Sequence, residues 1–242
     1  MKGKNLKRNK QNLEGHKIAI IIESKFISEE VYAYCFGFAA LGATVEYLSR
    51  IYYGSYRPGH PDWKEPVFLS DVDPNDDEPW TSVQKLKFTL WEDKVSFDRP
   101  ILRDFSAAAL NDYSAILMAA NYTSVRLRYE GLDFDKIPPN FNVKDFIRTF
   151  PASKFFSQAM TDKKVVKGAL CHGLWILTPY PELLKGRKVI CHTVVMADIA
   201  LTEAEITLNK VVVDEDLVTG YSKNEVVPFI EEIKKRILSI CR

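Results

Sequence analysis

The sequence lacks any run of the ~18 apolar residues that a membrane span requires, and its beginning lacks the apolar region of a secretory signal. We therefore expect a cytoplasmic protein with no membrane partner. An excess of one charge is also missing, because 33 Lys and Arg residues face 32 Asp and Glu residues. Since a net charge of +1 creates no global field toward polyanions, we expect no nucleic-acid partner.

Cysteine is scarce and irregularly spaced. The four cysteines show neither CxxC spacing nor the density of a disulfide-rich secreted domain, so we expect free thiols at Cys35, Cys171, Cys191 and Cys241. The cysteines and histidines lack the spacing of a zinc site, and the acidic run "DVDPNDDE" is typical of a solvated loop. Phosphate-binding and dinucleotide-binding glycine motifs are absent as well. The sequence thus predicts no metal and no cofactor.

Internal repeats and low-complexity domains are absent too, and a chain of 242 residues with 46% hydrophobic residues can bury one large core. We expect a single domain over residues 17–242. Residues 1–16 begin with "MKGKNLKRNK", five basic residues and no acid, which indicates a disordered basic tail. Residues 51–104 are polar, aromatic and proline-rich, and we interpret them as an insertion whose Trp63 and Trp80 could cover a pocket.

The apolar patterns predict alternating strands and helices. The β-branched run "KIAIIIE" at 17–23 is typical of a strand buried on both faces, and the helix signal that begins at Ser28 leads to a second strand, "ATVEYLS". This βαβ opening favours a doubly wound α/β sheet. Further elements are expected as strands at 113–118 and 165–170, a hairpin turning at 214–216, and helices at 152–160 and 224–240. The predicted fold is a flavodoxin-like three-layer α/β/α sandwich with a mostly parallel sheet.

One apolar run, "VVKGALCHGLWIL" at 165–177, is interrupted by Cys171-His172-Gly173. A strand that turns at once into a helix through a reactive side chain indicates a nucleophile elbow, in which the backbone is strained. Because Gly173 has no Cβ, helix and neighbouring backbone can approach closely. The alternative is that Cys171 is a buried, inert residue at an ordinary strand end.

A helix N-terminus would favour the Cys171 thiolate, and its amides can hold the oxyanion of an attacked carbonyl. The second oxyanion donor is expected in the loop after the strand at 113–118, where the amides of Ala120 and Asn121 are candidates.

The stretch "GALCHGLWIL", followed by "LLKGRKVICH", resembles the signature region of the ThiJ/PfpI superfamily, which has the class I glutamine amidotransferase-like fold. The resemblance extends over about residues 17–240. It implies that Glu30 lies against the cysteine sulfur with a raised pKa and transfers protons, that His172 acts as a base, and that His192 lies beside the site. Without it, Glu30 would be an ordinary first-turn acid and His192 a polar residue at a strand end.

Two features depart from the family pattern. Relatives usually carry Pro-Gly-Gly at the oxyanion loop, where this chain has Met118-Ala119-Ala120; alanine is disfavoured if that loop needs a positive φ. The segment "VTGYSKNEV" also lacks the histidine of the His-x-Glu pair that amidotransferases place after their last strands. We therefore expect no conventional Cys-His-Glu amidotransferase triad.

The resemblance implies a cysteine-dependent enzyme in which Cys171 attacks a carbonyl of a small-molecule or peptide substrate. Two substrate classes remain open: an amide or peptide bond, as in intracellular protease/amidase members, and a 2-oxoaldehyde, as in glyoxalase III-like members. Relatives are commonly homodimers, so we expect a homodimer. The alternatives are a redox sensor or stress chaperone that uses the same thiol without turnover, and a scaffold with a vestigial cysteine.

Overall fold

The computed structural model describes residues 12–23, 25–50, 101–128 and 134–240, together with three short strands between 67 and 90. Most of the predicted basic tail and of the predicted insertion lies outside the described residues, as do Trp63, Trp80 and the acidic run. The division of the chain into tail, domain and insertion therefore stays a prediction.

An eight-stranded sheet forms the centre of the molecule, with strand order β11-β12-β8-β7-β1-β2-β6-β5. Only the edge strand β11 pairs antiparallel to its neighbour, so the predicted mostly parallel sheet is confirmed. The strands are β1 (Lys17–Ile21), β2 (Thr44–Ser49), β5 (Thr89–Leu90), β6 (Ile101–Asp104), β7 (Ala115–Met118), β8 (Val166–Leu170), β11 (Val211–Asp214) and β12 (Leu217–Gly220).

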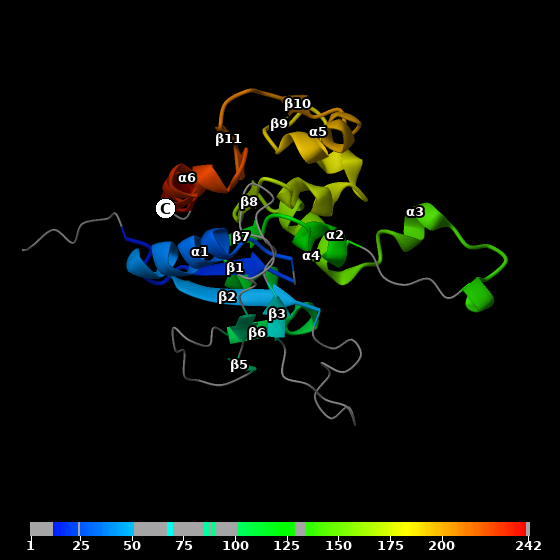
Figure 1. The fold of residues 1–242 in the computed structure, drawn as a ribbon, viewed down its shortest axis with the longest axis horizontal. Helices are drawn as coiled ribbons and strands as arrows, with labels where there is room; N and C mark the ends of the chain where they lie inside the picture. Colours follow the sequence, from blue (N-terminus) through cyan, green and yellow to red (C-terminus); the bar gives the residue numbers. More distant parts are fainter. Residues whose placement is uncertain are drawn as a thin grey trace, which may run out of the picture.

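Helices cover both faces of this sheet (Figure 1). On one face α1 (Ser28–Ala40) and α6 (Val226–Ile240) pack against each other and bury Ile18 and Ile20 of β1. On the other face α4 (Pro151–Thr161) and α5 (Thr193–Ala200) share a core with Ile21. Because successive side chains of a strand point to opposite faces, the unbroken apolar run of β1 supplies both cores.

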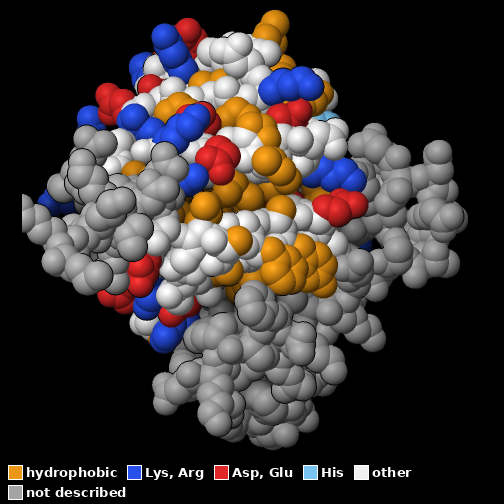
Figure 2. Space-filling model, turned by 90° about the vertical axis from the view of Figure 1, so that its left-hand side faces the viewer, with side chains coloured by type: hydrophobic (Ala, Val, Ile, Leu, Met, Phe, Trp, Pro, Cys, Tyr) orange, Lys and Arg blue, Asp and Glu red, His pale blue; other side chains and the backbone are white. Residues whose placement is uncertain are grey.

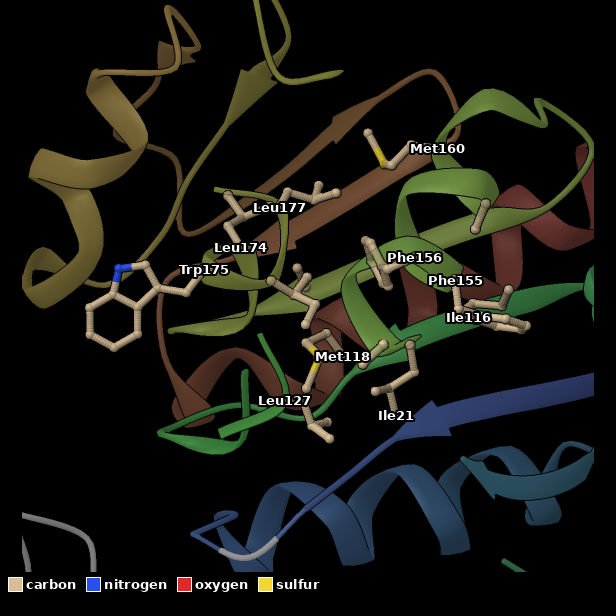
Figure 3. Packing of buried hydrophobic residues seen from close by; sticks show 14 of the residues in the cluster. Ile21, Ile116, Met118, Leu127, Phe155, Phe156, Met160, Leu174, Trp175 and Leu177 are labelled. Atoms are coloured by element: carbon tan, nitrogen blue, oxygen red, sulfur yellow. The ribbon is translucent and has the colours of Figure 1, made fainter. Parts of the chain in front are cut away.

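The second core lies below the region of the predicted elbow. Figure 3 shows Leu174 and Leu177 packed toward Met118 of β7 and Phe156 of α4. The segment that carries these leucines is η5 (Gly173–Leu177), a 3-10 helix. The helix predicted after Cys171 is present as this short 3-10 segment. The chain then reaches η6 (Pro181–Leu183), where Pro181 cannot donate a backbone hydrogen bond.

The remaining elements lie at the edges. Short strands β9 (Lys188–Val189) and β10 (Glu205–Ile206) form a parallel pair, and β3 (Val67–Leu69) pairs antiparallel with β4 (Lys85–Lys87). Connecting segments contain α2 (Thr123–Leu127), α3 (Val143–Phe146), η2 (Phe105–Ala107), η3 (Leu110–Asp112), η4 (Phe134–Lys136) and η7 (Lys223–Glu225). In Figure 1, α3 lies on an arm that projects from the body.

A buried ion pair joins β8 to the start of β12. Lys167 is fully buried, and its ammonium group contacts Asp216, which also accepts from Arg187 at 2.8 Å. Such a pair costs desolvation but disfavours any register that would separate the two charges. It therefore helps to fix β8 beside β12, at the opposite end of β8 from Cys171.

The described surface matches the balanced composition. Figure 2 shows the face on the left of Figure 1, where basic and acidic side chains are interspersed around apolar ones. Among the described helices, none has the length and apolar character needed to cross a bilayer.

Candidate active site

Cys171 occupies the turn directly after β8. Its φ is +55°, in the left-handed region that a residue with a Cβ adopts only at a cost. Two backbone hydrogen bonds hold it there: its N–H donates to Gly220 O at 2.8 Å, and its carbonyl accepts from His192 N–H at 3.1 Å. The predicted nucleophile elbow is thus present, with the residue only 6% exposed.

Gly173 allows the turn to pack closely. A Cβ at this position would lie 3.2 Å from the Ala169 Cβ and 3.4 Å from the Met118 carbonyl oxygen, closer than nearly all such contacts. Glycine therefore lets η5 approach β7 and β8 closely without a shift of these neighbours. Among the described residues, no acceptor is found for the backbone N–H groups of His172 and Gly173, so both remain able to bind an anion.

His172 is buried against aromatic rings and a second histidine. Its ring centroid lies 5.7 Å from that of Tyr122 and 5.2 Å from that of Trp175, and its Nε2 lies 3.4 Å from His192 Nδ1. Burial first, and the charge of a neighbouring His192 second, lower the pKa of His172 to about 4. The ring is therefore neutral at neutral pH, and a group with so low a pKa is a weak base.

His192 lies at the N-cap of α5, where its Nδ1 accepts from Val194 N–H at 3.3 Å. His192 is therefore not simply a polar residue at a strand end, because its side chain caps a helix. Its ring also lies 5.3 Å from that of Tyr221. Because Nδ1 accepts the capping bond, a neutral His192 carries its proton on Nε2.

Cys171, His172 and His192 form one cluster. Each offers a sulfur or ring nitrogen, and these three atoms all lie within 4.8 Å of one another. The sequence places His192 twenty-one residues after Cys171, and the backbone bond between the two residues closes that gap. The structure thus brings together three of the four predicted catalytic residues.

Glu30, the fourth, is fully buried at the start of α1. Both of its carboxyl oxygens accept from Ala120 N–H, at 3.0 and 3.1 Å. Burial raises the pKa of Glu30 to about 8, although the Tyr34 hydroxyl and the Ala120 amide oppose that rise. The predicted direction is the one found, and its main cause is burial. Most of the Glu30 population is therefore protonated at neutral pH.

The same hydrogen bonds change the interpretation of the oxyanion loop. The Ala120 amide, predicted to hold an oxyanion, is already occupied by Glu30. Neither Ala119 nor Ala120 has a positive φ; the left-handed residue is Asn121, with φ +65°. Asparagine tolerates this region better than alanine, so Ala119 and Ala120 introduce no backbone strain here.

Tyr34 was missed by the sequence interpretation. It is fully buried on α1, and both Glu30 and Cys171 lie near enough for their negative charges to raise the pKa of its hydroxyl, in addition to the dominant effect of burial. Its hydroxyl lies close enough to the Glu30 carboxyl to lower the pKa of that group, although no hydrogen bond of good geometry joins the two. The signal was its spacing, because residues four apart share one helix face.

Trp175 separates this cluster from a nearby cavity. Its indole nitrogen, which points away from the apolar core in Figure 3, donates to Asp198 at 2.6 Å, and the Arg128 guanidinium lies 5.4 Å from its ring. A cavity of about 280 Å³ lies on that side, lined by Arg128, Thr178, Pro181, Asp198, Leu201 and Thr202. None of the predicted site residues lines it.

Comparison with known proteins agrees with this geometry. Residues 142–236, which include Cys171, His172 and His192, match the model of the DJ-1/PfpI family. The predicted family resemblance is confirmed. Glu30 and Ala120 lie outside the matched residues, so their place in the site depends on the contacts described above. A comparison with curated proteins found no match.

Solved structures show the same DJ-1/PfpI fold. A ThiJ/PfpI domain protein from Brachyspira murdochii is similar with a TM-score of 0.63 and 12% identity, over 93% of this chain and 98% of that one. Oxidized DJ-1 from Toxoplasma gondii gives 0.58 and 13%, over 93% and 96%. A two-domain protein from Anabaena variabilis, with DJ-1/ThiJ/PfpI-like and ferritin-like domains, gives 0.59 and 18%, over 92% and 48%. This chain therefore spans about half of the Anabaena protein. Such identities establish the fold alone.

Proposed function

We propose that this protein is a cysteine-dependent enzyme in which Cys171 attacks the carbonyl carbon of its substrate. The observation that carries the proposal is the strained Cys171, with two imidazoles within 4.8 Å of one another and of its sulfur. A strained backbone and adjacent ionisable groups are features that catalytic nucleophiles share.

Two residues, His192 and Glu30, can transfer protons during the reaction. His192 is the better candidate to take the thiol proton, because the low pKa of His172 makes that ring a weak base. Glu30, largely protonated at neutral pH, can donate a proton and take one back near its pKa of about 8. The free amides of His172 and Gly173 supply donors for an oxyanion, in place of the occupied Ala120 amide.

We favour a small 2-oxoaldehyde as substrate over a peptide. Cys171 and His172 are each 6% exposed, so a small molecule reaches the sulfur more readily than a polypeptide does. The thiolate would add to the aldehyde carbon and form a hemithioacetal. The proton on that carbon then moves to the neighbouring carbonyl carbon, and the proton of the hemithioacetal hydroxyl moves to the neighbouring carbonyl oxygen, which gives a 2-hydroxyacyl thioester. Water then releases the 2-hydroxy acid and the thiol. One water is added overall, and no redox cofactor is needed.

The test is lactate formation from methylglyoxal, followed by NMR in the absence of glutathione so that glutathione-dependent contaminants stay silent. The wild type should turn over, and Cys171→Ala should lose at least 100-fold of the rate. Cys35→Ala is the matched control, since Cys35 is a thiol on α1 near Tyr47 and should leave the rate unchanged. Equal rates for wild type and Cys171→Ala would contradict the proposal.

The second candidate function is a redox sensor. It is favoured by one observation: the backbone amides of His172 and Gly173, which directly follow Cys171 and have no acceptor among the described residues, can stabilise an oxidised, anionic cysteine. Stoichiometric oxidation of Cys171 by peroxide, seen by peptide mass mapping and without turnover of any aldehyde or peptide, would favour it. A homodimer and a cytoplasmic location remain predictions from the sequence, to be measured by light scattering and by fractionation.

A further inference from the structure

The cluster of Cys171, His172 and His192 has the composition of a metal site. Thiolate sulfur and imidazole nitrogen are the ligands that zinc prefers, and three protein ligands with one open position are typical of zinc sites that bind a further molecule. Within the described residues, this is the one group of three such side chains whose ligand atoms lie close together.

The separation of the two ring nitrogens fits a tetrahedral ion. Zn–N bonds of about 2.05 Å at tetrahedral angles place two ligand nitrogens about 3.3 Å apart. The observed separation of His172 Nε2 and His192 Nδ1 is 3.4 Å. At present His192 Nδ1 faces His172 Nε2 and also accepts from Val194 N–H, so the His192 ring must turn and release this capping bond for its lone pair to meet an ion.

The backbone around the cluster is already fixed. His192 N–H donates to the Cys171 carbonyl at 3.1 Å, and the Ser124 hydroxyl donates to the His172 carbonyl at 3.0 Å. His172 is 94% buried, and its Nδ1 has no hydrogen-bond partner among the described residues. Because Nδ1 has no competing partner, it can hold the ring proton while Nε2, the nitrogen that faces His192, binds an ion.

We propose that Cys171, His172 and His192 bind one Zn²⁺ ion, with the fourth position open to water or a small anion. Binding releases the thiol proton and moves no electrons, since zinc has no redox chemistry here. The bound sulfur cannot attack a carbonyl, so the zinc-bound and catalytic states exclude each other. Zinc binding itself does not depend on the proposed catalysis, and either proposal can fail alone.

The first test is zinc competition against a chromophoric chelator, with the full chain and three variants. Cys171→Ser should weaken binding at least 100-fold. His192→Asn removes the ligand nitrogen but keeps an N-cap acceptor, and it should weaken binding at least tenfold. Cys35→Ala should bind like the wild type. Wild-type affinity in Cys171→Ser, or no binding to the wild type at micromolar zinc, would overturn the proposal.

A second test uses only the wild type, in case a variant fails to fold. Co²⁺ substituted for Zn²⁺ should give ligand-field bands of a tetrahedral ion and a sulfur-to-cobalt charge-transfer band. Zinc should also slow the alkylation of Cys171 by iodoacetamide at least tenfold, measured by peptide mass mapping, and leave Cys35 unaffected. Cobalt binding without the sulfur band, or alkylation of Cys171 at an unchanged rate, would show that the sulfur is not a ligand.

Discussion

Replacing Glu30 by glutamine should change how the stability of the protein depends on pH. Glu30 is fully buried and its pKa is raised from 4.5 to about 8, chiefly by burial. Between these two values the folded state keeps a proton that the unfolded state has released. Folding stability therefore falls as pH rises from about 4.5 to about 8, and the contribution of the neutral carboxyl is fully present only below that interval. Glutamine stays neutral and keeps an oxygen for the Ala120 amide.

The size of the effect follows from the two pKa values. Their difference corresponds to about 5 kcal/mol, at 1.36 kcal/mol for each pKa unit. Water entry and local relaxation reduce such values, so we expect a gain of about 2–5 kcal/mol for Glu30→Gln over the wild type at pH 9. At pH 4.5 to 5 most of that gain should be absent, because the wild-type carboxyl is then neutral in the folded state.

The assay is urea unfolding of both proteins at several values between pH 4.5 and 9, compared as the difference in the free energy of unfolding at each pH. Taking this difference removes the contribution of groups that titrate alike in both proteins. Glu29→Gln is the matched control, since Glu29 is the exposed neighbour on α1, paired with Lys223, and should give a flat difference. A flat difference for Glu30→Gln would refute the reasoning, because it would mean that Glu30 has the same pKa in the folded and the unfolded protein.

Three further predictions concern the surroundings of the site. Asp216→Asn should cost about 3–5 kcal/mol in urea unfolding, because it leaves the fully buried Lys167 without its countercharge; an unchanged midpoint would show that the pair is dispensable. Gly173→Ala should cost about 1–3 kcal/mol in the same assay through overpacking, and a neutral result would mean that η5 moves freely. Tyr34→Phe should raise the pKa of Glu30 further, as seen by NMR titration of a ¹³C-labelled carboxyl, whereas a lower pKa would contradict the stabilising role of the hydroxyl.

The sequence alone was sufficient for the strands β1, β2, β7 and β8 and for the turn at Cys171, but not for β5 and β6, which lie within the predicted insertion and pair in the central sheet. The apolar runs that form β1 and β8 are buried on both faces of the sheet. Such a strand can be recognised from its continuous apolar residues alone, without knowing which strands lie beside it. Cys171 and Gly173 were predictable as a turn because the interruption of an apolar run by reactive and flexible residues is a local feature. The type of the following helix was not predictable, since the choice between a 3-10 and a regular helix depends on how η5 packs onto β7 and β8.

The tertiary structure decided the chemistry around that elbow. It closes a separation of twenty-one residues to bring His192 to Cys171, and it directs the Ala120 amide to the Glu30 carboxyl. It also buries Glu30 completely, which sets its pKa. The local sequence determines the backbone conformation because steric clashes and turn-forming hydrogen bonds act between residues that are close in the chain. The distances and the burial that control proton affinity and metal binding arise only when segments far apart in the chain pack together.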